Sequence, residues 1–350
     1  MPYECDYSEA LLEQVNNAIA NKTPLAIQGS NSKSFLGREV NGQILDMRPH
    51  CGIVNYDPKE LIITARAGTP LQEIEEALSE AGQMLPCEPP HFGPGATWGG
   101  MVACGLAGPR RPWSGSVRDF VLGTRVITGH GKHLRFGGEV MKNVAGYDLS
   151  RLMAGSYGCL GVLTEISMKV LPKPRATISL RLDLNLQRAM SEIAQWQTQP
   201  LPISALCYSE NALWIRLEGG DGSVKAARER LGGEVVANQF WQQLREQQLP
   251  FFSLPEELWR ISLPIDAPVI DFPGKQLIDW GGAVRWLKSA ADAEQIRQMA
   301  AGAGGYATRF RAGDGCFSPL SAPLLHYHKR LKMQLDPCGV FNPGRMYVEI

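Results

Sequence analysis

Hydrophobic residues near the start of the chain change from helical to strand-like spacing. Ser8 is a candidate N-cap, and apolar side chains then recur every three to four residues until the break at Pro24. These side chains are Leu11, Leu12, Val15 and Ile19. Short apolar runs typical of strands follow at residues 25–27, 44–47 and 61–68. The pattern predicts a helix that packs on a sheet.

A second amphipathic helix is predicted over residues 70–82. Pro70 suits the first helical turn, because the N–H that proline lacks is not needed there. Leu71, Ile74 and Leu78 then lie on one face. Strands and helices therefore alternate, which predicts an α+β or an α/β fold.

The pattern changes after the proline-containing stretch at residues 171–176. Beyond it we predict amphipathic helices at 224–233 and 293–305 and short strands at 213–219, 259–264 and 284–288. A change of this kind favours a domain boundary, and 350 residues exceed what one hydrophobic core usually serves. We expect two domains, over residues 1–174 and 175–330, and a final segment over residues 331–350.

Charge and cysteine content narrow the classes of function. Lys plus Arg total 35 and Asp plus Glu total 35, so no net charge attracts nucleic acid, and we expect no such partner. The eight cysteines include no CxxC pair, which argues against zinc ribbons and bound iron–sulfur clusters, and we predict no metal site. No run approaches the ~18 apolar residues of a membrane span. We expect a cytoplasmic chain that is at most peripheral to the inner membrane, through a complex.

Glycine-rich loops are the first candidates for ligand chemistry. Residues 28–37, QGSNSKSFLG, follow a predicted strand, and backbone N–H groups in such a loop can hold a diphosphate. Residues 85–138 contain twelve glycines, which would let a flat or anionic ligand lie against the main chain. Taken alone, each segment is also consistent with tight turns or a plain connection. Neither GxGxxG after a strand nor GxxxxGK[ST] occurs, so a Rossmann or P-loop site is disfavoured.

A third cluster is KNVAGYDLSRLMAGSYGCLGVLTEISMKVLPKP, at residues 142–174. Together with residues 28–37 and the ATWGG sequence at 96–100, it resembles the FAD-binding domain of the vanillyl-alcohol oxidase and p-cresol methylhydroxylase (PCMH) type. The resemblance implies an α+β fold in three parts. They are a PCMH-type FAD-binding domain of two α/β subdomains over residues 1–174, a smaller α+β cap with an antiparallel sheet over 175–330, and a tail over 331–350 that returns to the FAD domain.

The same resemblance implies the contacts of the FAD. The pyrophosphate loop would be formed by Gln28, Gly29, Ser30, Asn31 and Ser32. The ribityl chain and isoalloxazine would lie along Pro89, Thr97, Gly99, Gly100, Ser114 and Gly115. The remaining contacts would come from Gly155, Gly158, Gly161 and Val162, with Asn342 of the C-terminal DPxxxxNPG sequence reaching the ring.

Two residues near these loops are alternatives for covalent attachment. Family members that tether flavin use a histidine or a cysteine in these loops, and residues 28–32 contain neither. His91 and Cys104 are the nearest candidates, but a lone His or Cys beside glycines is more often simply packed. We expect noncovalent FAD.

The segment RAGDGCFS, at residues 311–318, departs from the pattern of similar 2-hydroxyacid dehydrogenases, which have HxGDGNxH. Arg311 and Ser318 stand at the histidine positions and Cys316 at the asparagine position. Oxidation of a 2-hydroxy acid needs a group that accepts the hydroxyl proton, and histidine suits that role near neutral pH. Arginine can only hold a carboxylate. Arg309 and Arg311 are therefore candidate carboxylate contacts, and the catalytic base stays unknown.

An intact flavin site beside an altered substrate site resembles the smaller FAD-binding subunits of bacterial glycolate-oxidising complexes. The resemblance implies two partners, a larger homologous FAD subunit and an iron–sulfur subunit, and oxidation of glycolate to glyoxylate with electrons passed through the partner to an acceptor such as quinone. His326 and His328 lie on the predicted terminal helix, where we expect surface residues.

Two hypotheses stay open. The favoured one is a relay or scaffolding flavoprotein subunit, and the other is a self-sufficient dehydrogenase of small 2-hydroxy acids such as glycolate or D-lactate. A third, reduction of an enolpyruvyl sugar nucleotide, would need NADPH and a proton donor in the cap, and the sequence gives no strong reason for either.

Overall fold

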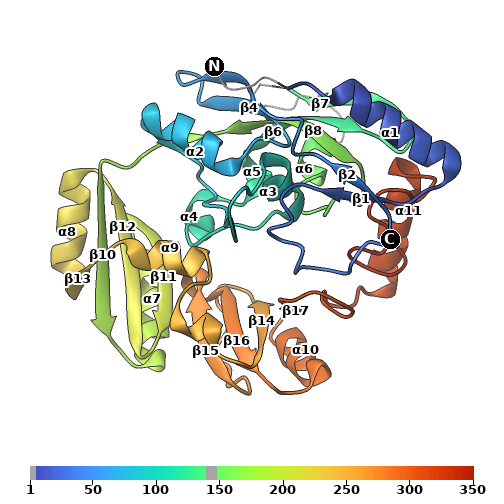
Figure 1. Ribbon diagram of the computed structural model, residues 1–350. Coiled ribbons are helices and arrows are strands. Elements are labelled where there is room, and N and C mark those ends of the chain that lie inside the picture. Colours follow the sequence, from blue (N-terminus) through green and yellow to red (C-terminus); the bar gives the residue numbers. More distant parts are fainter. Residues whose placement is uncertain (1–4, 139–147) are drawn as a thin grey trace.

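The computed structural model describes residues 5–138 and 148–350, which form two lobes (Figure 1). The N-terminal lobe, up to residue 172, carries a five-stranded sheet, and the C-terminal lobe, residues 176–309, carries an eight-stranded sheet. Residues 142–147 of the third glycine cluster lie outside the described residues. The final helix α11 (Ala322–Leu335), red in Figure 1, lies beside the N-terminal lobe.

The described helices of the N-terminal lobe are α1 (Ser8–Asn21), α2 (Leu71–Glu80), α3 (Trp98–Cys104), α4 (Arg111–Ser114), α5 (Val117–Phe120) and α6 (Leu149–Leu152). Its described strands are β1 (Leu25–Gln28), β2 (Gln43–Asp46), β3 (Ile53–Asp57), β4 (Ile62–Arg66), β5 (Gln83–Met84), β6 (Val121–Ile127), β7 (His133–Gly137), β8 (Val162–Lys169) and β9 (Leu171–Pro172). The order β3-β4-β8-β6-β7 is antiparallel throughout. β1 pairs with β2 in parallel, and β5 pairs with β9 antiparallel.

The hydrophobic spacing of the first two predicted helices is confirmed. Leu71, Ile74 and Leu78 of α2 are fully buried, and Leu11 and Val15 of α1 belong to the same core. Each helix therefore covers the sheet with one apolar stripe, as the spacing requires.

The predicted N-cap of α1 is wrong. Ser8 is the first helical residue, Tyr7 is the N-cap residue, and its side chain makes no capping bond. The Ser8 amide instead donates to Asp6 Oδ1 at 2.9 Å. A carboxylate two residues earlier can satisfy a first-turn N–H as well as a serine hydroxyl, so the cap was misplaced by local turn chemistry.

The C-terminal lobe is built on one antiparallel sheet with the strand order β13-β10-β12-β11-β15-β16-β14-β17. Its described strands are β10 (Ala176–Asp183), β11 (Ile203–Ser209), β12 (Ala212–Gly219), β13 (Glu234–Val236), β14 (Glu257–Ser262), β15 (Lys275–Asp279), β16 (Val284–Ser289) and β17 (Tyr306–Arg309). Its helices are α7 (Leu186–Gln197), α8 (Asp221–Leu231), α9 (Gln239–Arg245) and α10 (Ala293–Gly302), with 3-10 turns η1 (Pro250–Ser253) and η2 (Trp280–Gly282). The antiparallel sheet expected for the second part of the chain is therefore present.

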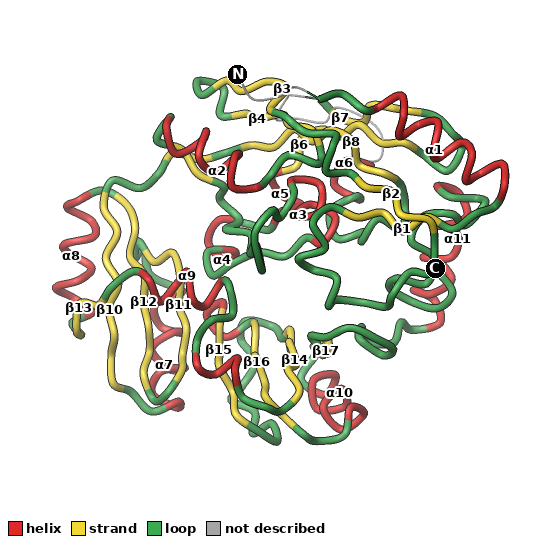
Figure 2. The backbone as a smooth tube through the Cα atoms, viewed as in Figure 1, coloured by secondary structure: helices red, strands yellow, loops and turns green. Residues whose placement is uncertain are grey.

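The two lobes have separate hydrophobic cores, and the end of the chain belongs to the first. Val340 and Phe341 are buried in the N-terminal core, and the Leu25 amide donates to the Val340 carbonyl at 2.7 Å. The tail thus returns to β1, as expected. Figure 2 shows that loops, in green, occupy much of the region between the strands of the two lobes. Loops carried by rigid sheets are the usual place for a ligand site.

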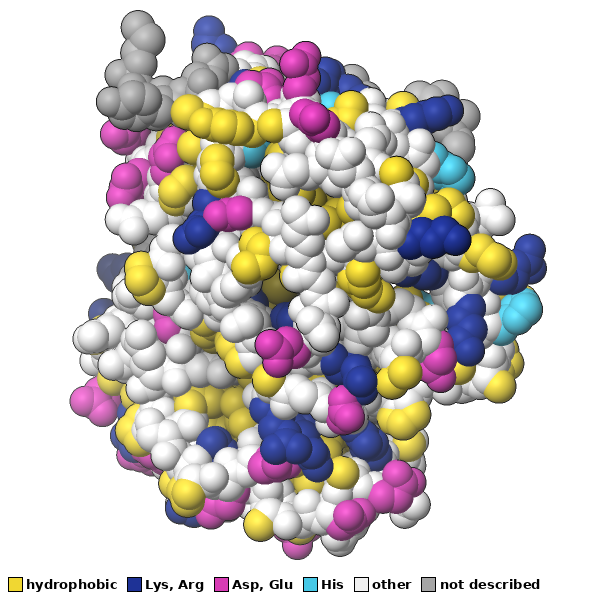
Figure 3. Space-filling view, turned by 45° about the vertical axis from the view of Figure 1, so that its right-hand side comes forward, with side chains coloured by type: hydrophobic (Ala, Val, Ile, Leu, Met, Phe, Trp, Pro, Cys, Tyr) yellow, Lys and Arg dark blue, Asp and Glu magenta, His cyan; other side chains and the backbone are white. Residues whose placement is uncertain are grey.

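Side chains of both signs are interspersed on the face shown in Figure 3, and Lys and Arg side chains gather over its lower part. Among the described residues, no helix has the length and apolar character needed to cross a membrane. Nor do His, Cys, Asp and Glu side chains in the described ranges group in a way that would hold a metal ion.

Candidate cofactor-binding site

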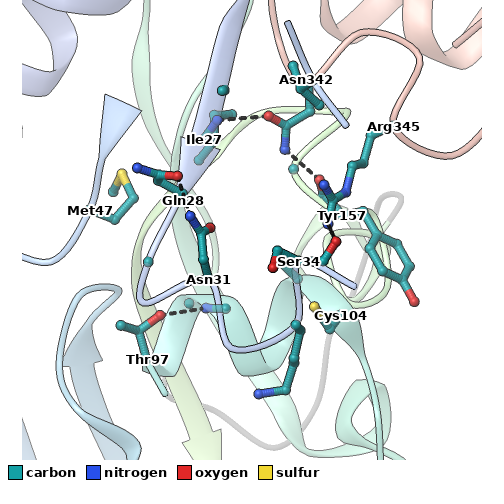
Figure 4. Close-up of a pocket in the computed structure, with 18 of the residues that line it drawn as sticks. Ile27, Gln28, Asn31, Ser34, Met47, Thr97, Cys104, Tyr157, Asn342 and Arg345 are labelled. Atoms are coloured by element: carbon teal, nitrogen blue, oxygen red, sulfur yellow. Dashed lines mark hydrogen bonds between the residues drawn. The ribbon is translucent and has the colours of Figure 1, made fainter. Parts of the chain in front are cut away.

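A cavity of about 1020 Å³ lies where the glycine-rich loops meet. This volume is at the upper end of the roughly 300–1,000 Å³ usual for ligand pockets, so the cavity has room for a large cofactor. The predicted FAD contacts that line it are Gln28, Gly29, Ser30, Asn31, Ser32, Thr97, Gly99, Gly100, Gly158, Gly161 and Asn342. Figure 4 shows Gln28, Asn31 and Thr97 on one side of the cavity and Asn342 and Tyr157 on the other.

The loop after β1 presents unused backbone donors. The N–H groups of residues 29–32 donate to no other residue in the described part of the chain, although the Met47 amide donates to the Gln28 carbonyl just before them. Asn31 has φ 60°, a left-handed conformation that asparagine tolerates better than most residues. Several adjacent free amides in a bent loop form an anion-binding concavity. The loop therefore fits the diphosphate of FAD.

The N-terminus of α3 forms the wall next to this loop. Thr97 caps α3 by accepting from the Gly100 amide at 3.2 Å, and the Gly99 amide donates to the Ala67 carbonyl at 2.7 Å. A Cβ on Gly29 would lie 2.3 Å from Thr97 Oγ1. Glycine at position 29 therefore allows the loop to lie directly against α3. The amides of Gly99 and Gly100 already donate hydrogen bonds within the protein, so they are not free to bind a ligand.

Asn342 joins β1 to the loop before β8 across the cavity wall. Its Oδ1 accepts from the Ile27 amide at 2.8 Å, and its Nδ2 donates to the Tyr157 carbonyl at 2.7 Å, as Figure 4 shows. Both bonds connect backbone groups that would otherwise lack partners near the cavity. Asn342 lines the cavity, but its side-chain amide is already hydrogen-bonded to the backbone of Ile27 and Tyr157 and so links these two segments of the wall. Its predicted reach to the flavin ring stays a prediction.

Lys33, Tyr157 and Arg345 also line the cavity, and the sequence analysis did not name them as cofactor contacts. Lys33 is buried, and its Nζ donates to the His91 carbonyl at 3.1 Å. Burial lowers the pKa of Lys33, while the Cys104 thiol and Glu246 act in the opposite direction. Arg345 donates to the Arg38 carbonyl at 3.0 Å and so ties the tail to the end of the loop. The position of Lys33 inside the Gly/Ser-rich loop 28–37 was the sequence signal that could have identified it as a contact for an anionic group.

Tyr157 has φ 52°, which is uncommon for a bulky residue and indicates local strain. Its backbone lines the cavity, while its ring points away from it and meets the Phe317 ring edge-on at 5.3 Å. Burial raises the pKa of Tyr157, and the charge of Arg260 acts against that rise. Tyr157 thus connects the cavity to side chains of the C-terminal part of the chain.

The other predicted FAD contacts do not line this cavity: Pro89, Ser114, Gly115, Gly155 and Val162. Ser114 Oγ donates to the Pro86 carbonyl at 2.6 Å, and the Gly155 amide donates to the Val102 carbonyl at 3.0 Å. These groups serve the local backbone, and their contact with FAD stays a prediction.

Of the two alternatives for covalent attachment, only Cys104 lines the cavity. His91 Nε2 lies 3.1 Å from Glu75 Oε2 instead. Burial raises the pKa of the Cys104 thiol, although Lys33 and Arg345 lower it. A thiol held in its protonated form is a weak nucleophile, which agrees with the expected noncovalent cofactor.

The predicted carboxylate contacts are held away from the cavity. Arg309 Nε lies 3.0 Å from one oxygen of Glu257, and Arg311 pairs with the other oxygen at 2.8 Å. Cys316 Sγ donates to the Arg309 carbonyl at 2.9 Å, and Ser318 Oγ donates to the Ala307 carbonyl at 2.7 Å. Arg311, Cys316 and Ser318, which replace the residues of the HxGDGNxH pattern, therefore bond to this segment or to the adjacent strands β14 and β17.

The same segment nevertheless borders the cavity. Ala312 lines it, and the Gly313 amide donates to the Gly37 carbonyl at 3.0 Å. His326 and His328 on α11 do not line it. His326 is exposed, as expected for a surface residue, and His328 is half-buried.

Comparisons with known proteins agree with an FAD-binding flavoprotein. A family model described as an FAD binding domain matches residues 4–137. The chain is 80% identical over 347 residues to "Glycolate oxidase subunit GlcE" of Escherichia coli (strain K12), covering 99% of each chain. It is 32% identical to "Glycolate oxidase subunit GlcD" of Bacillus subtilis (strain 168), over 46% of this chain and 34% of that one. A "D-lactate dehydrogenase" of Anaerostipes hadrus is 28% identical over 67% of this chain and 50% of its own length.

A solved alkyldihydroxyacetonephosphate synthase shares the fold at 17% sequence identity, with a TM-score of 0.67 over 97% of this chain and 76% of that one. The fold, the cavity and these matches define an FAD-dependent oxidoreductase flavoprotein with a PCMH-type FAD-binding fold. Within that class, the chain belongs to the family of glycolate oxidase subunit GlcE.

Proposed function

We propose that this chain is the FAD-holding subunit of a complex that oxidises glycolate to glyoxylate and accepts other small 2-hydroxy acids such as D-lactate. The observation that carries the proposal is the cavity formed by the three glycine-rich segments, in a chain 80% identical to a glycolate oxidase subunit. FAD supplies the two-electron acceptor of such an oxidation. The residues of this chain bind and orient it.

The lining residues fit FAD in their chemistry. The free amides of residues 29–32 suit the diphosphate, and the buried ammonium of Lys33 adds positive charge to the same cavity. Small residues on the opposite wall, among them Gly158 and Gly161, let a flat ring lie close to the backbone. We propose these contacts, with the remaining predicted ones, as the FAD site of a flavin domain over residues 1–174 and 331–350. Residues 175–330 form its cap.

The proposed role in the complex is that of a relay or scaffold. No histidine among the described residues lines the cavity, and the histidine positions of related dehydrogenases hold Arg311 and Ser318. Among the described residues, the cavity therefore lacks the histidine that suits removal of a hydroxyl proton near neutral pH. We therefore assign the oxidation step to a larger homologous FAD subunit and the onward transfer of electrons to an iron–sulfur subunit. Through these partners the chain acts in the cytoplasm or on the inner-membrane surface.

An anaerobic titration tests the proposal. The purified chain is loaded with FAD and mixed with glycolate, alone and with its partner subunits, while the visible absorbance of the flavin is followed. We expect the absorbance to stay unchanged in the isolated chain and to bleach in the complex. Bleaching of the isolated chain by glycolate would contradict the relay role and support a self-sufficient dehydrogenase. Failure to retain FAD at all would contradict the site itself.

A further inference from the structure

Cys5 and Cys51 lie opposite each other in the fold, although they are far apart along the chain. They form an isolated antiparallel backbone pairing outside the named strands. All eight cysteines belong to the described residues, and none is bonded to another. Cys5 and Cys51 are the two that a backbone pairing places opposite each other, and neither lines the cofactor cavity. The FAD site therefore does not explain this arrangement.

The geometry of this pairing suits a disulfide bond. Residues directly opposite each other in an antiparallel pair have Cα atoms roughly 4.5–5.5 Å apart, and their side chains lie on the same face. A disulfide needs Cα atoms about 4.4–6.8 Å apart. The two thiols can therefore be joined without a large movement of the backbone.

Contacts of the neighbouring residues hold the two segments in register. The Tyr7 amide donates to His50 Nδ1 at 3.0 Å. Arg66 Nη2 lies 3.5 Å from Asp6 Oδ2, and Arg66 Nη1 donates to the Cys51 carbonyl at 3.4 Å. One guanidinium thus connects the segment that carries the first cysteine to the backbone of the second. The pairing is fixed by side chains that have no part in the cofactor cavity.

Both thiols belong to half-buried residues, so a small reagent can reach them. Burial raises the pKa of the Cys51 thiol, Cys5 and Glu73 add to that rise, and Arg66 opposes it. A small thiolate fraction slows attack on a disulfide but does not prevent it. In a reducing compartment such a pair is reduced at rest and is oxidised only when an oxidant accumulates.

We propose that Cys5 and Cys51 are a redox modification site, at which a low-molecular-weight disulfide such as glutathione disulfide converts the two thiols to an intramolecular disulfide. One cysteine thiolate attacks a sulfur of glutathione disulfide, breaks its S–S bond and releases one glutathione thiolate. The second cysteine thiolate then attacks the protein sulfur of the mixed disulfide and releases the other. The cysteines lose two electrons and two protons, and the oxidant becomes two molecules of reduced glutathione.

The disulfide would lock the segment before α1 onto the loop before β3. The His50 amide donates to the Met47 carbonyl at 3.1 Å, and Met47 lines the cofactor cavity. The lock therefore holds a loop that reaches the cavity wall. Closing a long loop also removes freedom from the unfolded chain, so the oxidised form should unfold at a higher temperature. The proposal does not depend on the function proposed above.

Peptide mapping by mass spectrometry tests the proposal. The FAD-loaded chain is reduced, freed of reductant, incubated with glutathione disulfide and then alkylated. We expect a linked pair of peptides that contain Cys5 and Cys51, with no glutathione on either residue. Cys5→Ser and Cys51→Ser should each retain one glutathione on the remaining cysteine, because the second thiol is missing. Cys338→Ser removes an exposed cysteine at the end of α11 and should form the same link as wild type.

The same reaction in urea shows whether the fold brings the thiols together. In a buffer of reduced and oxidised glutathione, the link should form about tenfold or more readily in the folded chain than in the unfolded one, because folding has already closed the loop. Equal formation in both states would overturn the proposal. So would two unreacted thiols in the wild-type chain, glutathione retained on both residues, or links of either cysteine mainly to another cysteine. The wild-type map decides between these outcomes even if a serine variant fails to fold.

Discussion

Single residues of the cavity wall hold conformations that most side chains avoid. Asn31, Tyr157 and Asn342 all have positive φ although none is glycine. Such strain is kept only where the surroundings enforce it, and it gathers at ligand sites. Gly29 shows the steric side of the same constraint, because the space for a Cβ is already taken by Thr97. The wall is therefore built for close approach of backbone to ligand.

Gly29→Ala should weaken FAD binding about tenfold or more, because the loop must move away from α3 and its free amides then lose their arrangement. The Kd is measured by fluorescence titration of the apoprotein with FAD. Gly222→Ala is the control, since a Cβ there meets nothing within 4 Å. It should leave the Kd within about twofold of wild type. A folded Gly29→Ala variant with wild-type affinity would rule out this loop as the FAD diphosphate site.

At the scale of elements, α11 fastens the tail to the cavity wall. Lys332 of α11 is buried, and its Nζ donates to the carbonyls of Cys159 and Phe341, each at 2.7 Å. It also pairs with Asp336 at 2.8 Å. Asp336 in turn accepts from the Val340 and Phe341 amides, so one ion pair satisfies backbone groups on both sides. Asn342 follows directly, which makes this helix end a support of the cavity.

Lys332→Met should lower the free energy of unfolding by about 3–5 kcal/mol, because Asp336 is left as an unpaired buried charge. The loss is measured by urea unfolding, and FAD affinity should fall with it as the tail loosens. Lys329→Met changes an exposed lysine of the same helix and should alter stability by less than about 0.5 kcal/mol. Equal stability of the two variants would show that the Lys332 contacts do not fasten the tail.

At the scale of the whole molecule, buried ion pairs join the two lobes. Glu88 of the N-terminal lobe pairs with Arg216 of β12 at 2.9 Å and with Arg110 at 3.4 Å. Arg110 also pairs with Glu218 of β12. Burial by itself raises the pKa of Glu88, but Arg216 and Arg110 outweigh it, so the pKa is lowered and the carboxylate stays charged. The lobes are thus aligned by charges that are costly to separate.

Glu88→Gln should loosen the contact between the lobes without emptying the cavity. It keeps the side-chain volume, removes the 2.9 Å ion pair across the lobe boundary, and leaves Arg216 with the longer contact to Glu218 of its own strand at 3.6 Å. Hydrogen exchange should become faster in β12, while the Kd for FAD stays within about threefold of wild type, since the lining residues lie mostly in the N-terminal lobe. Glu80→Gln, at the exposed end of α2, should change neither quantity. Unchanged exchange in β12 of the Glu88 variant would refute this role of the network.

The sequence determined the features that depend on local chemistry. Apolar spacing identified the buried faces of α1 and α2, because one stripe of a helix must face a core. The glycine-rich segments identified the loops around the cavity, because close approach of backbone to ligand requires small residues there. Their order along the chain was enough to indicate the FAD-binding family, which the comparisons confirm.

Only the tertiary structure decided which distant groups meet. Asn342 bonds to Ile27, 315 positions away, and no spacing along the chain encodes that contact. Arg309 and Arg311 were candidates by position, but both form ion pairs with the one carboxylate of Glu257 on a neighbouring strand. A hydrophobic pattern specifies that a face is buried, whereas the partner of a charge depends on how the sheets pack.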